Sequence, residues 1–170
     1  MRVSAVGWAF NTDKDALSEA EASAAFTNNH PEGIKGAQAV ALSVFRARSR
    51  VGKDAIRTEI IGRLVYDLSA TLDEIRPSYF FDETCPGTVP QAITAFLESD
   101  DYEDAIRKTI SLVCDADTLA AITGSITEVF HGGVPQNIVE QVRKRVPVEL
   151  WNLIEEFRQK YLLLGIHPPE

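Results

Sequence analysis

Apolar residues recur at intervals of three and four along most of the chain, the spacing that places side chains on one face of an α-helix. The stretches that could be extended, 3–6 and 79–81, are too short to build a sheet. The pattern therefore predicts an all-α fold, an orthogonal or bundled set of helices joined by short loops. The predicted helices end near Phe26, cover 32–48, 53–65, 72–75 and 102–114, and begin near Thr88, Asp115, Pro135 and Pro147.

Polar and small residues indicate where these helices begin and end. Asp13 or Asp15 is predicted to cap the first long helix, since aspartate accepts hydrogen bonds from free amides. Thr88 follows Pro86-Gly87 and is predicted to cap the helix after it. Gly132-Gly133 is a typical left-handed helix stop. The segment 102–114 shows the cleanest helical period, and we expect it to lie at the centre of the fold.

Size and charge narrow the function classes. The 170 residues are enough for one core, so a single domain over 1–170 is predicted. The chain has 25 acidic and 17 basic residues, a net charge of −8 and no basic block, which argues against nucleic acid as a partner. No apolar run approaches the roughly 20 residues of a membrane span. Two distant cysteines, Cys85 and Cys114, show no zinc or disulfide spacing. We expect a soluble cytoplasmic protein with no membrane partner.

Asp115, Asp117 and Thr118 are the most informative group of polar residues. They stand at the start of an apolar helix and supply two carboxylates and a hydroxyl, the hard oxygen donors that Mg²⁺ prefers. The same residues are also common helix caps, because Asp and Thr accept hydrogen bonds from free amides and acids suit the positive end of the helix dipole. Both interpretations stay open. A full divalent site would need further ligands from the chain, water or a partner.

His30 and Glu32 are a second candidate pair. They could serve acid–base chemistry if both faced one cleft, whereas the alternative is a polar turn followed by an acid in the first turn of a helix. Cys114 falls on the apolar stripe of its helix and is predicted to be a core thiol. The sequence has no glycine-rich phosphate loop and no motif for a covalent nucleophile. The residues alone therefore leave the catalytic group unknown.

Four blocks of the sequence together resemble the ADP-ribosylglycohydrolases. They are MRVSAVGWA at 1–9, NHPEGIKGAQA at 29–39, PGTVPQAITAFLES at 86–99 and DADTLAAITGSI at 115–126. The resemblance extends over about 1–146. It implies an all-α domain that removes ADP-ribose from proteins or small acceptors by using two magnesium ions.

The resemblance also implies roles for individual residues. Asp115, Asp117 and Thr118 correspond to the C-terminal part of the family's di-magnesium site. Four other residues correspond to positions near the bound ADP-ribose: Met1, Arg2, Asn28 and His30. Asn28 stands where family members commonly have a histidine, and Val113-Cys114 replaces a usual Gly-Gly.

The family's other metal segment, Thr-Asp-Asp-Thr, its catalytic glutamate and a Gly-Asn-Gly loop lie ahead of the position that matches Met1. The resemblance therefore leads us to expect a domain truncated at the N-terminus, inactive as an isolated chain. Helices missing from this core would leave an apolar face bare, which predicts a homodimer or a complex with a separately encoded N-terminal half. Two interpretations remain: a hydrolase completed from outside, or a non-catalytic member kept for oligomerisation or ADP-ribose binding.

Overall fold

The computed structural model describes residues 2–112 and 115–161, and within these ranges the chain forms helices and loops without any strand. The all-α prediction is confirmed. In chain order the helices are α1 (Ser4–Ala9), α2 (Asp13–Ala25), α3 (Pro31–Arg48), α4 (Lys53–Leu64), α5 (Leu72–Ile75), α6 (Cys85–Glu98), α7 (Tyr102–Ile110), α8 (Ala116–His131), α9 (Gln136–Arg143) and α10 (Val148–Tyr161). No helix in the described ranges is long and apolar enough to cross a membrane.

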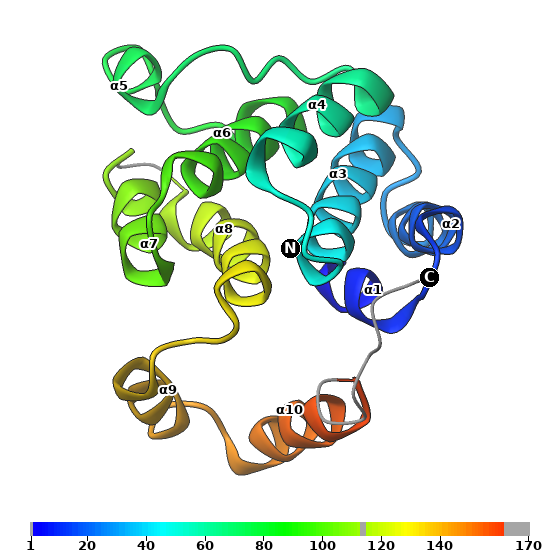
Figure 1. Ribbon diagram of the computed structural model, residues 1–170, viewed down its shortest axis with the longest axis vertical. Coiled ribbons are helices and arrows are strands. Elements are labelled where there is room, and N and C mark those ends of the chain that lie inside the picture. The colour runs from blue at the N-terminus through cyan, green and yellow to red at the C-terminus, as the bar shows by residue number, and fades with distance from the viewer. Residues whose placement is uncertain (1, 113–114, 162–170) are drawn as a thin grey trace.

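Helix α3 lies at the centre of the fold. Figure 1 shows it between α2 on one side and α6 and α8 on the other, and it also contacts α1 and α4. All seven residues of 39–45 are buried, and all are apolar except Ser43. A helix that is covered on every side needs such a continuous uncharged run, because no face is left for charged residues.

The expectation that the segment 102–114 lies at the centre is wrong. Helix α7 lies at the edge of the molecule against α6 and α8, and it buries only Ala105 and Thr109 along its length. Its clean period arises because one face meets the core and the other meets water. A strongly amphipathic pattern thus marks the peripheral helix α7, whereas the central helix α3 shows a weaker one.

Two helix starts also differ from the prediction. Thr12, rather than Asp13 or Asp15, caps α2, and its Oγ1 accepts a hydrogen bond from the Asp15 amide at 3.1 Å. Thr84, rather than Thr88, caps α6, where its Oγ1 accepts from the Gly87 amide at 3.2 Å. Helix α6 thus begins three residues before Thr88. Proline suits the first turn of this helix, since the amide it lacks would have no helical partner there.

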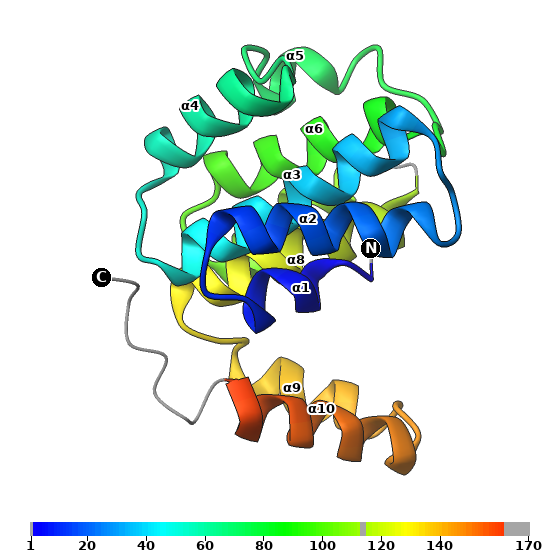
Figure 2. The same ribbon diagram turned by 90° about the vertical axis from the view of Figure 1, so that its right-hand side faces the viewer.

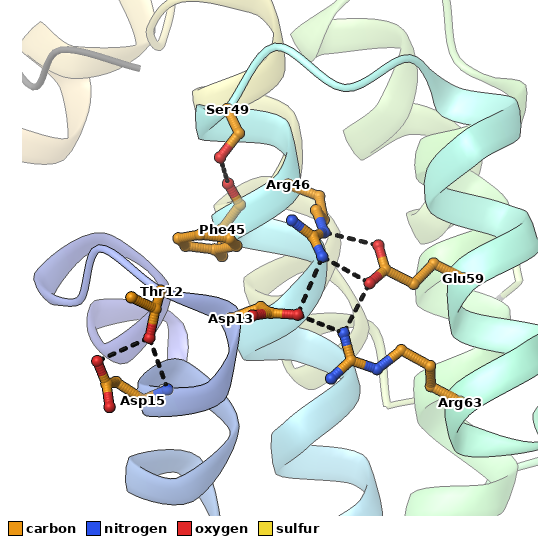
Figure 3. A network of polar contacts seen from close by, with 8 residues as sticks. All are labelled: Thr12, Asp13, Asp15, Phe45, Arg46, Ser49, Glu59 and Arg63. Atoms are coloured by element: carbon orange, nitrogen blue, oxygen red, sulfur yellow. Dashed lines mark hydrogen bonds and ion pairs between the residues drawn. The ribbon is translucent and has the colours of Figure 1, made fainter. Parts of the chain in front are cut away.

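A polar network joins α2, α3 and α4 (Figure 3). Arg46 on α3 donates from Nε and Nη2 to the two carboxylate oxygens of Glu59 on α4, at 2.6 and 2.7 Å. Arg63 Nη1 donates to Glu59 at 2.8 Å and to Asp13 at 2.7 Å. Arg46 also reaches Asp13 at 3.2 Å. The four side chains fix α2 and α4 against the central helix.

Residues 134–161, here called the α9–α10 arm, stand apart from the other helices. Figure 2 shows α9 and α10 on the side of α1, away from α3 and α6. Neither helix of the arm has a buried residue. Gly132 and Gly133 connect the arm to α8 with φ angles of +82° and +140°, so the predicted left-handed stop is confirmed.

Candidate functional site

A cavity of about 380 Å³ lies where the start of α1, the end of α2 and the first turns of α3, α6 and α8 meet. Its lining includes Arg2, Asn28 and Thr118, three of the residues singled out from the sequence. They come from segments far apart in the chain, so the fold brings together what the sequence marked separately. Apolar side chains of Val40, Val89 and Ile122 form much of the remaining wall, which suits a ligand with a flat or apolar part.

Arg2 and Asn28 lie at the α2 side of this cavity. Arg2 Nη2 donates to Thr27 Oγ1 at 2.6 Å and to the Ser23 carbonyl at 2.8 Å, and this fixes the start of the chain against the end of α2. The Asn28 backbone amide donates to the Ala24 carbonyl at 2.8 Å, which positions the residue just past the helix end. Arg2 is exposed, so its charge is available to an anion at the cavity mouth.

The opposite wall depends on a close approach of α3 and α6. A Cβ added to Gly36 on α3 would lie 3.1 Å from both Cβ and Sγ of Cys85, so the absence of a side chain lets the two helices meet there. Burial raises the pKa of the Cys85 thiol. Cys85 is therefore a neutral wall residue at physiological pH, since only a thiolate would act as a nucleophile or metal ligand.

Asp115, Asp117 and Thr118 lie at the start of α8. Asp115 is the residue before the helix, yet its side chain caps no amide. A hydrogen bond with the Asp115 side chain lowers the pKa of Asp117, and the Thr118 amide lowers it further. The two carboxyl groups therefore lie side by side. Of the three residues, Thr118 lines the cavity, whereas Asp115 and Asp117 do not. Helix capping therefore accounts for the hydrogen bond between Asp117 and the Thr118 amide, but it gives no role to the Asp115 carboxylate.

This donor set fits a magnesium ion that keeps part of its water shell. Two adjacent carboxylates and a hydroxyl supply hard oxygens, and Mg²⁺ is commonly held by one or two carboxylates together with substrate phosphates. In 2–112 and 115–161 no group of three or more His, Cys, Asp or Glu side chains gathers around one point. The described residues thus suit a half-open site and do not form a closed cage.

The other candidates lie elsewhere. His30 caps α3, because its Nδ1 accepts a hydrogen bond from the Glu32 amide at 3.2 Å, and it does not line the cavity. This is the geometry of the polar turn, the alternative to an acid–base pair. Met1, Val113 and Cys114 lie outside the described residues.

On the α6 side of the cavity, the sequence did not identify four polar lining residues: Glu83, Thr84, Cys85 and Thr88. They belong to the loop before α6 and to the first turn of α6. The prediction that Thr88 caps this helix had placed Glu83, Thr84 and Cys85 ahead of the helix. The available signal was Pro86, since proline favours the first turn of a helix and would have moved the start back to Cys85. Thr88 is buried, and its Oγ1 donates to the Asp82 carbonyl at 3.1 Å, so it shapes the loop that carries Glu83.

Comparison with known proteins gives one finding. No curated protein and no solved structure matched the chain. The family model described as ADP-ribosylglycohydrolase matches residues 1–165, nearly the whole of the 170-residue chain. This match covers every element that lines the cavity. The chain belongs to the ADP-ribosylglycohydrolase family.

Proposed function

We propose that the cavity binds an ADP-ribosyl group and that the chain takes part in hydrolysis of its glycosidic bond. The observation that carries this proposal is the meeting of Arg2, Asn28 and Thr118 in one cavity of about 380 Å³, within a chain of this family. A volume of this size falls in the range of ordinary small-molecule sites.

Each wall of the cavity has a role in this proposal. The Arg2 guanidinium binds a phosphate oxygen of the ligand, a contact that its planar array of N–H groups suits. Asn28 offers an amide to ribose hydroxyls. The apolar side chains of Val40, Val89 and Ile122 pack against the adenine. A positive group at the mouth matters here, because the chain as a whole has a net charge of −8 and repels anions.

Asp115, Asp117 and Thr118 would hold magnesium in this proposal. When bound, a divalent ion neutralises phosphate charge and lowers the pKa of a coordinated water. The hydrogen bond from the Asp115 side chain lowers the pKa of Asp117, so the two groups lie close together and the Asp117 carboxylate favours its ionised form, which a cation binds. The two ions that the family implies would require more carboxylates than these two. The second ion therefore depends on ligands other than Asp115, Asp117 and Thr118.

Calorimetric titration with MgCl₂ tests the metal site. We expect the chain to bind Mg²⁺ more tightly with ADP-ribose present, because a phosphate adds ligands to the ion. Asp115→Asn and Asp117→Asn should each weaken binding by about tenfold or more, since each removes one of the ion's few protein ligands. Asp54→Asn is the matched control, an aspartate in the first turn of another helix, α4, where it has no part in the donor set at the start of α8. Equal heats for all four proteins would contradict the proposal.

A release assay separates the two interpretations of the family membership. ADP-ribosyl-arginine, ADP-ribosyl-serine and O-acetyl-ADP-ribose serve as substrates, and free ADP-ribose is measured. Magnesium-dependent release that is lost in Asp115→Asn supports a hydrolase. Tight binding of ADP-ribose without release favours the non-catalytic member, for which the half-open donor set at α8 is the supporting observation.

We also propose that the rim of the cavity binds a protein partner, either a second copy or another polypeptide. Phe26 is 90% exposed and precedes the lining residues Thr27 and Asn28, while Phe81 is exposed and lies two residues before Glu83. Exposed aromatic side chains are typical of interaction surfaces. Light scattering after size exclusion should give a mass above that of one chain, and Phe26→Ser should reduce it. A monomer at micromolar concentration would contradict a second copy as the partner.

A further inference from the structure

A second cavity, of about 440 Å³, lies between α1, α8 and α10. The proposed function does not use it. Trp8 on α1, together with Ile154 and Phe157 on α10, forms an apolar wall. Two groups of opposite charge also line it: the Glu128 carboxylate from α8 and the Arg158 guanidinium from α10. The cavity thus combines an apolar surface with one negative and one positive group, each on a different helix.

The two charged groups face one space without forming a pair. No ion pair or hydrogen bond joins Glu128 to Arg158 among the ion pairs of 2–112 and 115–161. Burial raises the pKa of Glu128, and the charge of Arg158 opposes that rise, so the groups interact across the cavity. A half-buried carboxylate without a direct partner carries a desolvation cost, which a bound cation would offset.

Two smaller groups add polar contacts. Ser125 Oγ donates to the Ile122 carbonyl at 2.8 Å, which leaves the hydroxyl oxygen free to accept a hydrogen bond from an ammonium group. Ser4 lines the cavity from the first turn of α1. Trp8 also lines the cavity, and an indole ring suits both a cation and an apolar side chain. Acceptors therefore lie on the α1–α8 side, whereas the anion-binding group lies on α10.

We propose that this cavity binds a small zwitterion with an apolar body, such as a free α-amino acid with an aliphatic or aromatic side chain. Its ammonium group contacts Glu128 and Ser125, its carboxylate contacts Arg158, and its side chain packs on Trp8 and Phe157. Such a ligand bridges the gap between the two charges and fills the apolar space. It also ties the α9–α10 arm to the rest of the molecule, since its contacts come from both.

Thermal unfolding of the full chain with L-leucine tests the proposal. Leucine at ten times its Kd should raise Tm by about 4 °C, the shift expected for a one-site ligand on a domain of this size. Isoamylamine lacks the carboxylate and 4-methylpentanoate lacks the ammonium group, so each alone should give a smaller shift. Glu128→Gln and Arg158→Gln should each remove the leucine effect. Glu156→Gln and Lys160→Gln, exposed positions on the same helix that do not line the cavity, should keep it.

Fluorescence gives an independent readout. The chain has two tryptophans, and Trp151 lines a different cavity, so a Trp151→Phe variant reports Trp8 alone. Leucine should change its emission with the same concentration dependence as the Tm shift. No response to leucine up to 20 mM, or a response retained in Glu128→Gln, would overturn the proposal. Neither result bears on magnesium or ADP-ribose binding, which concerns the first cavity.

Discussion

Two threonines on α8 show how much a single buried hydroxyl matters. Thr123 and Thr127 are both 0% exposed and lie one helical turn apart. Thr123 Oγ1 donates to the Ala92 carbonyl of α6 at 2.9 Å, whereas Thr127 Oγ1 has no partner. A buried hydroxyl without a hydrogen bond costs free energy, and one with a bond to a neighbouring helix recovers it.

The pair predicts opposite effects for the same substitution. Thr123→Val should lower the free energy of unfolding by about 1 kcal/mol, because it removes an interhelical hydrogen bond. Thr127→Val should leave it unchanged or raise it by up to about 1 kcal/mol, since valine keeps the shape without the hydroxyl. Urea denaturation measures both, and each variant is the control for the other. A larger loss for Thr127→Val than for Thr123→Val would refute the assignment of partners.

At the residue scale the sequence indicated only part of the candidate site. Arg2 and Asn28 came from the family resemblance and Thr118 from its oxygen donor beside two aspartates, and all three line one cavity. Glu83 could not be found, because its position depends on how a loop folds across α3. His30 was a reasonable candidate from its neighbours, but the free amide of Glu32 takes up its ring nitrogen. The sequence shows which chemical groups a residue carries, whereas the tertiary structure decides which groups it contacts.

At the scale of elements, the network between α2, α3 and α4 predicts a dependence of stability on pH. Hydrogen bonds from Arg46 lower the pKa of Glu59, and a hydrogen bond from Arg63 lowers the pKa of Asp13. A carboxyl group whose pKa is depressed on folding stabilises the folded state above its unfolded pKa, about 4.3 for Glu and 3.9 for Asp. This stabilisation is lost as pH falls through the depressed folded values.

Glu59→Gln should therefore lower the free energy of unfolding at pH 7 by about 1 kcal/mol, a modest figure because the side chains are partly exposed. The difference from the wild type should shrink as pH falls below the unfolded pKa of about 4.3 and through the depressed pKa of folded Glu59. Thermal unfolding between pH 3 and 7 measures it. Glu19→Gln, an exposed position on α2, is the control and should follow the wild-type profile. A constant difference at every pH would contradict the prediction.

The helices themselves were largely predictable from the sequence, while their ends and packing were not. Helical spacing located α3, α4, α5 and α8 to within a residue or two. The first residues of α2 and α6 were missed because several capping residues compete near each start, and only the fold shows that Asp13 binds Arg46 and Arg63 instead. The central place of α3 was hidden because burial on all sides weakens a helical period.

For the whole molecule, the division between the α9–α10 arm and the rest of the chain predicts how it unfolds. Residues 1–133 have 12 basic and 20 acidic residues, whereas 134–161 have five basic and four acidic. The α9–α10 arm is thus slightly positive, whereas residues 1–133 are acidic. Neither α9 nor α10 has a buried residue. Local opening is cheapest where few apolar contacts must be broken.

Limited proteolysis should cut first near Gly132-Gly133, where both residues have positive φ and a Cβ added to either would meet nothing within 4 Å. A variant ending at Gly133 should keep its helices and lose less than about 2 kcal/mol of unfolding free energy, since the buried core lies within 3–129. Circular dichroism and urea denaturation measure both quantities. A Cβ added to Gly62 would also meet nothing within 4 Å, but Gly62 lies inside α4. Cleavage at Gly62 should therefore be slow, and its rate is the internal comparison. If the shortened chain loses its cooperative unfolding transition, the α9–α10 arm packs against the core and contributes to its stability. In that case the prediction is wrong.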